Sequence, residues 1–339
     1  MQNNKGKKVS IKEIAKICDV SVATVSRVIN NNGRFSEATR IKVEKAIKKY
    51  GYTTNMAAKS LRSSHSKTIG VIVPNIDNEF FSAVVLKLEK IFFDNGYSVF
   101  ICNTSQNDQK EIDYFKSLDS KLVDGIICIT GRNEIPSDVI QRDIPIVCID
   151  RKPSMDSDAY YIESDNYLGG FIATEELIKK GCKNIVILSR LKTLSPNIQR
   201  LEGYKDALKK HNIEFNQNYV VQLNNSQSNF DGANESIQRL IENNFKFDGI
   251  FATNDWRAYG ALVALQKYNI SVPEKVKIVG FDGIPVSEYC YPPITTISQN
   301  KDMIAKEAST ILLDLINKTN IPEKRHTVIP VELIVRETT

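Results

Sequence analysis

Residues 21–30, SVATVSRVIN, combine a guanidinium, hydroxyls and an amide at helical spacing. A helix here places an apolar stripe on one side and a polar face on the other. The stripe holds Val25, Val28 and Ile29, and the polar face holds Ala23, Ser26, Arg27 and Asn30. A guanidinium can donate two hydrogen bonds to one guanine, and hydroxyls and amides suit phosphate oxygens. Arg27 is therefore a candidate base reader, and Ser21, Thr24 and Asn30 are candidate phosphate contacts.

A second set of polar side chains follows apolar, strand-like runs in the motifs PNIDNEFF, IDR, ATND and GFDG. Carboxylates and amides near aromatic rings suit a polyhydroxylated ligand, because hydroxyls need directional partners and the C–H face of a sugar packs on rings. The same Asp and Asn side chains also suit caps of the helices that follow. Both interpretations stay open for any one residue, whereas the whole set favours a ligand.

Motifs of common enzyme classes are missing from the sequence: we find no GxGxxG, GxxxxGK[ST], GxSxG or HExxH. None of the three histidines stands beside a candidate nucleophile. The six cysteines form no CxxC pair, which is typical of buried free thiols. We therefore expect a protein that is not an enzyme and uses neither a metal nor a cofactor.

Charge is distributed unevenly along the 339 residues. Residues 1–64 hold 14 Lys and Arg against 4 Asp and Glu, a net charge of +10, whereas residues 65–339 hold 31 against 36, a net charge of −5. A basic end on a nearly neutral body is typical of a nucleic-acid-binding module. The apolar runs are too short to span a membrane and the start lacks a signal-peptide pattern, so we expect a cytoplasmic protein bound to the nucleoid.

Three short helices are predicted in the basic end. Ser10 and Glu13 form a capping-box pattern before the first helix, Ser21 and Ser36 suit the caps of the next two, and Gly51 suits the end of the third. On the third helix we expect Ile41, Ala46, Ile47 and Tyr50 to face inward. Two short helices joined by a tight turn, with a third behind them, predict a helix-turn-helix domain over residues 1–52.

The remaining chain divides into a short polar segment, 53–66, which we expect to be a hinge, and a body, 67–339. Apolar runs in the body alternate with segments of helical period, which predicts parallel sheets covered by helices on both faces. We expect two lobes, one from about 68–162 and 291–325 and the other from about 163–290 and 326–339. Ligands of such sheets bind at the carboxyl ends of the strands.

The run VSVATVSRVIN resembles the lactose-repressor (LacI) family, and the similarity continues to the C-terminus. The resemblance implies that the second helix lies in the major groove, that Val22 and Ala23 touch bases and that Arg27 reads a guanine. It also implies a hinge that orders on operator DNA, with Leu61 wedged into the minor groove. The DNA contacts expected on this basis are Ser21, Val22, Ala23, Thr24, Ser26, Arg27, Asn30, Thr39, Asn55, Lys59, Leu61 and Arg62.

The body also resembles periplasmic ribose-binding proteins, which implies a periplasmic-binding-protein type I-like fold. Matching their motifs position by position gives a ring of ligand contacts, which are Asn78, Phe80, Phe81, Asp150, Arg151, Arg200, Phe230, Asn254, Asp282 and Gln299. Agreement at all these positions favours ribose or a close monosaccharide. Trp256 lies close to this set in sequence, where it either reshapes the site or packs between lobes.

The leading hypothesis is a transcriptional repressor that binds a pseudo-palindromic operator as a homodimer and is induced by a sugar. One alternative is a catabolite-control-type regulator that answers to a phosphorylated carrier protein, and another is a repressor for a disaccharide such as sucrose. A solute-binding protein for transport is a third, although the basic end counts against it. The final run VIPVELIVRETT contains no leucine heptads, so a dimer is expected rather than a tetramer.

Overall fold

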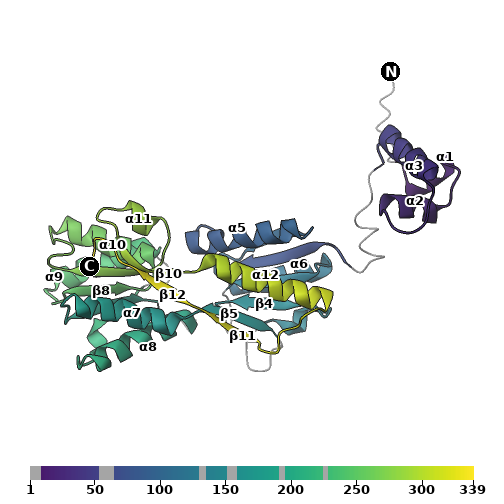
Figure 1. Cartoon of the computed structure of the whole chain (residues 1–339). Coiled ribbons are helices and arrows are strands. Elements are labelled where there is room, and N and C mark those ends of the chain that lie inside the picture. The colour runs from purple at the N-terminus through teal and green to yellow at the C-terminus, as the bar shows by residue number, and fades with distance from the viewer. Residues whose placement is uncertain (1–8, 53–64, 130–134, 151–158, 191–194, 224–227) are drawn as a thin grey trace, which may run out of the picture. The chain divides into compact units, whose positions relative to one another are not determined.

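The computed structural model describes residues 9–52, 65–129, 135–150, 159–190, 195–223 and 228–339. The chain divides into two compact units, residues 1–66 and 67–339 (Figure 1). We call them the head and the body. No helix in the described ranges is long and apolar enough to cross a membrane.

The described part of the head, residues 9–52 and 65–66, contains the helices α1 (Ile11–Ile17), α2 (Val22–Ile29) and α3 (Glu37–Tyr50). The predicted caps are confirmed, because the Ser10, Ser21 and Ser36 side chains each accept a hydrogen bond from the backbone N–H three residues later. Gly51 ends α3 in the left-handed conformation at φ 61°. Asp19, also left-handed at φ 48°, forms the turn between α1 and α2. These features make the head a helix-turn-helix.

The core of the head differs from the prediction on α3. Val43 is fully buried there and Ala46 nearly so, whereas Ile41 and Tyr50 are 43% and 41% exposed. Ile41 precedes Val43 by two residues, about 200° around the helix, so both cannot face the same core. Tyr50 occupies the last position of α3, at the end of the packed region.

Two six-stranded sheets form the body, and each belongs to one lobe. The first has the order β11-β5-β4-β3-β1-β2 and the second β12-β10-β9-β8-β6-β7. All pairs are parallel except β10 with β12. The first-lobe strands are β1 (Thr68–Val73), β2 (Ser98–Asn103), β3 (Gly125–Ile129), β4 (Ile146–Ile149), β5 (Tyr160–Ser164) and β11 (His326–Ile329). Those of the second lobe are β6 (Ile185–Ser189), β7 (Val220–Gln222), β8 (Gly249–Ala252), β9 (Lys277–Asp282), β10 (Thr295–Gln299) and β12 (Val331–Ile334).

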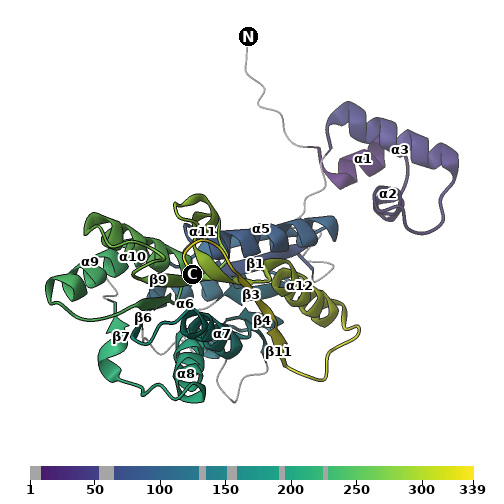
Figure 2. The same ribbon diagram turned by 60° about the vertical axis from the view of Figure 1, so that its left-hand side comes forward.

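Helices cover both faces of each sheet, as the alternating pattern predicts. In the first lobe, α5 (Glu79–Asp94) and α12 (Lys301–Asn317) pack on one face and α6 (Asp108–Ser120) on the other. In the second, α7 (Asn166–Lys179) and α8 (Ser195–Lys210) cover one face, and α9 (Asn229–Glu242) and α10 (Asp255–Lys267) the other (Figure 2). Short helices η1 (Ser137–Val139), η2 (Gln217–Tyr219) and α11 (Val286–Tyr289) lie in connections.

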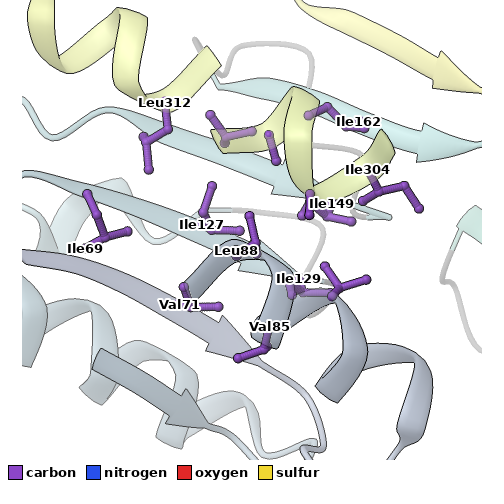
Figure 3. Close-up of a cluster of buried hydrophobic side chains, with 14 of the residues drawn as sticks. Ile69, Val71, Val85, Leu88, Ile127, Ile129, Ile149, Ile162, Ile304 and Leu312 are labelled. Atoms are coloured by element: carbon purple, nitrogen blue, oxygen red, sulfur yellow. The ribbon is translucent and has the colours of Figure 1, made fainter. Parts of the chain in front are cut away.

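The core of the first lobe shows why these segments form strands and helices. Alternate residues of β1 and β3, such as Val71 and Ile127, meet Leu88 of α5 and Leu312 of α12, and all four are fully buried (Figure 3). Period-two strands and a helical stripe thus bury complementary faces. None of the six cysteines, all of which lie in described ranges, forms a disulfide, and five of them are buried, as expected of packing thiols.

Two boundaries between the lobes differ from the prediction. Strand β10 was expected in the first lobe but pairs with β9 and β12 in the second sheet. Strand β11 was expected in the second lobe but pairs with β5 in the first sheet. Strand periodicity shows that a segment is extended without showing which sheet receives it. The chain therefore passes between lobes at residues 164–166, 299–301 and 329–331, which we call the crossing segments (Figure 1).

Candidate functional site

The exposed face of α2 carries the polar side chains predicted to read DNA. Ala23, Arg27 and Asn30 are exposed, as is the cap residue Ser21. Val25 and Val28 are buried in the head core on the opposite side. Thr24 and Ser26 are half-buried, and so is Val22, which packs against the head core.

Most polar groups on this face have local partners, and Arg27 is the exception. The Ser21 and Thr24 hydroxyls lie 2.9 Å apart, Asn30 Nδ2 donates to the Ser26 carbonyl oxygen at 2.8 Å, and the Thr39 hydroxyl lies 2.8 Å from that of Ser36. Arg27 makes no hydrogen bond or ion pair to the described residues. Its guanidinium is therefore free to donate to a guanine.

Gly33 lies beside the Arg27 side chain. The glycine has φ +90°, and a Cβ atom added there would lie 3.3 Å from Arg27 Cδ. The absence of a side chain at position 33 thus leaves room for the methylene stem of Arg27. Sequence reasoning missed this positioning residue, because a lone Gly after a helix reads as a turn.

We expect Gly33→Ala to weaken operator binding by roughly three- to tenfold, since the added methyl displaces a base-reading arginine. Gly51→Ala is the matched control, because Gly51 is also left-handed at φ +61° but its added Cβ would meet nothing within 4 Å. Both variants carry backbone strain, and only one disturbs Arg27. Operator titration by fluorescence anisotropy measures the affinity of each variant. Equal losses in the two variants would show that Gly33 does not position Arg27.

Five predicted contacts lie outside the described residues: Asn55, Lys59, Leu61, Arg62 and Arg151. They stay predictions.

In the body, Arg200 is the centre of a buried polar cluster. This residue of α8 is 6% exposed. Its Nε donates to Asn166 Oδ1 at 2.9 Å and its Nη1 to the Thr253 carbonyl oxygen at 2.6 Å. The guanidinium carbon lies 3.5 Å from the centroid of the Phe281 ring. Packing and hydrogen bonds therefore hold the guanidinium in one orientation.

Asp282 and Gln299 join Arg200 from the carboxyl ends of β9 and β10. Asp282 Oδ1 lies 3.8 Å from Arg200 Nη1 and accepts a 2.7 Å hydrogen bond from Gln299 Nε2. Gln299 Oε1 in turn accepts from the Ser164 hydroxyl at the end of β5, at 2.6 Å. Since Ser164 belongs to the first sheet and Gln299 to the second, this chain of hydrogen bonds ties the lobes together at two crossing segments.

Asp150 follows β4 and is 4% exposed, in the left-handed conformation at φ 51°. Its Oδ1 is buried without a hydrogen-bond partner among the described residues. Burial raises the pKa of Asp150 to about 6, and the Arg200 guanidinium offsets only part of that rise. An unsatisfied carboxylate oxygen beside a fixed arginine suits a ligand that donates a hydroxyl proton.

The remaining predicted residues that the structure describes cap helices or pack against neighbouring rings. The Asn78 side chain caps α5 by accepting from Phe80 N at 2.9 Å, and that of Asn254 caps α10 by accepting from Arg257 N at 2.8 Å. Phe80 is 3% exposed and belongs to the first-lobe core, with Phe81 half-buried beside it. Phe230, at the start of α9, packs against Tyr259, and the two ring centroids are 5.4 Å apart.

The structure thus brings Arg200, Asp282 and Gln299 into direct contact, with Asp150 close enough to act on Arg200 electrostatically. Sequence reasoning missed Lys301, whose Nζ donates to the carbonyl oxygens of Asp282 and Gly283 at 2.8 and 3.0 Å. It also missed Asn166 and Thr253, which accept hydrogen bonds from Arg200, and Arg257, which donates to the Thr253 hydroxyl. Asn166 and Thr253 give only the signal of a place just after a strand, which many loop residues share, and Arg257 lies in the first turn of α10.

The single tryptophan, Trp256, lies on α10 of the second lobe and packs against the hydrophobic core of the first lobe. Packing between lobes, one of the two interpretations from the sequence, therefore describes its position. Within the described residues, no group of three or more His, Cys, Asp and Glu side chains could hold a metal ion.

A helix-turn-helix head and a two-lobed α/β body with a buried polar cluster at its strand ends define a ligand-controlled DNA-binding protein. The family model of bacterial regulatory proteins of the lacI family matches residues 10–55, and that of the periplasmic binding protein-like domain matches residues 174–339. The ribose operon repressor of Escherichia coli (strain K12) is 32% identical over 325 residues, which are 95% of this chain and 97% of that protein. The transcriptional repressor PurR of Vibrio atlanticus (strain LGP32) is 34% identical over 334 residues, 97% of this chain and 98% of that protein.

Solved structures of regulators are also similar to this chain. A LacI family transcriptional regulator from Enterococcus faecium with bound ribose has a TM-score of 0.70 at 28% identity, covering 80% of this chain and 98% of that one. The lac repressor dimer bound to operator has a TM-score of 0.85 and covers 98% and 99%, and at 23% identity this likeness concerns the fold. The chain belongs to the lacI family of bacterial regulatory proteins. It is a DNA-binding transcriptional repressor of that family, and its relatives are regulators rather than enzymes.

Proposed function

We propose that the protein represses transcription as a homodimer on a pseudo-palindromic operator and is induced by ribose or a similar monosaccharide that binds between the lobes. The observation that carries the effector proposal is the buried cluster of Arg200, Asp282, Gln299 and Asp150, which draws on both lobes. Relatives named ribose operon repressors and the ribose-bound structure support it. Such a repressor acts in the cytoplasm, where it meets the chromosome.

The chemistry of the cluster favours a sugar over an apolar ligand. A guanidinium, an amide and carboxylates provide directional donors and acceptors for hydroxyl groups. Phe81 and Phe230 are half-buried rings near the start of α5 and α9, which suits the C–H face of a sugar ring. The remaining members of the proposed ligand set are Asn78, Phe80, Arg151 and Asn254.

The position of the cluster also suggests how a ligand controls the lobes. Gln299 and Ser164 belong to crossing segments, and Asp165 N donates to the Ile329 carbonyl oxygen at 2.9 Å, which joins the third. A sugar that binds one arrangement of the lobes more tightly shifts the population toward it. The resulting coupling free energy lowers the affinity for operator DNA.

In the head, we propose that Arg27 reads a guanine and that the other predicted contacts position α2 in the major groove. Its guanidinium is exposed and bonds to none of the described residues, which supports this assignment. The contacts proposed beside it are Ser21, Val22, Ala23, Thr24, Ser26, Asn30 and Thr39, with Asn55, Lys59, Leu61 and Arg62 in the hinge.

Calorimetry and tryptophan fluorescence of the intact protein test the effector. The ligands are ribose, ribose 5-phosphate, fructose, sucrose and a purine base. Saturable binding of a monosaccharide, with a change in Trp256 emission as the lobes move, is the expected result. Binding of sucrose alone would instead make the protein a disaccharide regulator. If every sugar is silent and a phosphorylated carrier protein binds, the protein is a catabolite-control-type regulator and the effector proposal is wrong.

We expect sugar affinity to fall as the pH drops below about 6, by at most about tenfold per pH unit. Burial raises the pKa of Asp150 to about 6 in the unliganded protein, and a sugar hydroxyl donates a stronger hydrogen bond to the ionised carboxylate than to the protonated carboxyl group. Affinity is therefore highest above that pKa and falls below it. Calorimetry of the wild type between pH 5 and 8 measures the profile. Asp150→Asn is the control, which should bind weakly and without this dependence. A flat wild-type profile would show that Asp150 does not accept from the sugar.

A further inference from the structure

Arg257 is an arginine beside the proposed sugar site that has no role in the function so far described. It lies in the first turn of α10 and is only 5% exposed. Its Nη1 donates to the Thr253 hydroxyl in a short hydrogen bond, and its Nη2 donates to Asn229 Oδ1 at 3.2 Å. Its Nε is buried without a hydrogen-bond partner in the described part of the chain.

These contacts locate the guanidinium within the proposed site. Thr253 directly precedes Asn254, and Asn229 directly precedes Phe230. Thr253 also holds Arg200, through its carbonyl oxygen at 2.6 Å, so one residue binds two guanidinium groups. Arg257 therefore lies among three of the residues proposed to bind the sugar: Arg200, Phe230 and Asn254.

Arg257 forms no ion pair with the described residues, and the Asp282 carboxylate acts on it only from beyond ion-pair distance. Both of its hydrogen-bond acceptors are uncharged, and no carboxylate among the described residues lies within 4.0 Å of it. Burial and the positive charges of Arg190 and Arg200 lower the pKa of Arg257 to about 9, and the Asp282 carboxylate offsets only part of that fall.

A buried, unpaired charge destabilises a folded protein unless a ligand of opposite charge binds it. Guanidinium groups bind phosphate and carboxylate through paired hydrogen bonds, and Arg257 retains an unused N–H donor. We propose that Arg257 forms an anion-binding subsite beside the sugar site, which takes a phosphate or carboxylate group on a monosaccharide effector. This proposal rests on the proposed sugar effector and specifies its charge.

The first test compares neutral sugars with their charged counterparts by calorimetry on the intact protein. The sets are ribose, ribose 5-phosphate and ribonate, and glucose, glucose 6-phosphate and gluconate. In at least one set the wild type should bind a charged member at least about tenfold more tightly than the neutral sugar. Comparing the sugar phosphate with the sugar acid in each set shows whether the subsite takes a phosphate or a carboxylate. A neutral sugar that binds as tightly as both charged counterparts overturns the anion subsite and leaves the sugar effector standing. Silence from all six compounds overturns both proposals.

The second test uses Arg257→Met, with Arg239→Met as the matched control. Arg239 is an exposed arginine of α9 whose hydrogen bonds to described residues stay within its own helix. Arg257→Met should abolish the preference for the charged ligand, and Arg239→Met should keep it. An unchanged preference in Arg257→Met overturns the proposal.

Thermal unfolding separates ligand binding from a structural role. Without ligand, Arg257→Met should unfold a few degrees higher than the wild type, because an unpaired buried charge is removed. Inorganic phosphate, compared with chloride at equal ionic strength, should stabilise the wild type and Arg239→Met but not Arg257→Met. If Arg257→Met unfolds at a lower temperature and phosphate acts alike on all three, Arg257 is a structural tie between α9 and β8 and the proposal is wrong.

Discussion

Replacing Arg200 with methionine is expected to lower sugar affinity by roughly 100-fold or more and to leave the protein bound to its operator when sugar is added. Arg200 is the member of the cluster with the most partners, since it contacts Asn166, Thr253, Asp282 and the face of Phe281. Its removal takes away a buried donor and leaves Asp282 without its ion-pair partner. Calorimetry measures the sugar affinity, and anisotropy with labelled operator measures the response.

The control for Arg200→Met is Arg142→Met in the first lobe. Arg142 also pairs with a carboxylate, Asp119, with Nε and Oδ1 2.9 Å apart, but does not belong to the cluster. The Arg142→Met variant should keep the wild-type sugar affinity and should still release its operator when sugar is added. If Arg200→Met binds the operator in the absence of sugar, the variant is folded and its head still binds DNA. Wild-type sugar affinity in Arg200→Met would remove this arginine from the site.

Arg27→Ala is expected to have the second large effect, which is on operator binding. Loss of a bidentate contact to guanine should cost about 1–3 kcal/mol of operator binding and relax the base preference at one position. Binding to random DNA should change little, because non-specific affinity depends mainly on phosphate contacts. Competition between operator and random duplexes at fixed salt measures both quantities.

Lys59→Ala in the hinge provides the opposite pattern, since a phosphate contact contributes alike to every sequence. This variant should weaken operator and random DNA by the same factor and reduce the salt dependence of both. An equal loss on the two kinds of DNA in Arg27→Ala would show that Arg27 contacts the backbone and reads no base.

Local features of the fold could be predicted because they depend on neighbouring residues. Ser10, Ser21 and Ser36 cap helices wherever the following residues favour a helix, and the structure confirms all three. The assignment of strands to lobes could not be predicted in the same way. Strands β10 and β11 pair with partners distant in sequence, and their own pattern is compatible with either sheet.

The candidate site also contains residues that could be predicted from the sequence and residues that could not. Arg200, Asp282 and Gln299 were expected together from motifs that resemble a known family, and the structure brings them into contact. Lys301 and Arg257 were missed, because their roles depend on which backbone and hydroxyl oxygens the fold brings near them. A lone Lys or Arg at the start of a helix gives no sequence signal for burial.

The central claim is that a sugar in the body controls DNA binding by the head. Its most direct test uses an operator selected from random DNA by the protein itself. Affinity for that operator is then measured at fixed salt while the sugar that binds best in calorimetry is added. We predict a loss of operator affinity of at least about tenfold at saturating sugar. An operator affinity that stays unchanged while the sugar site is saturated would contradict the account.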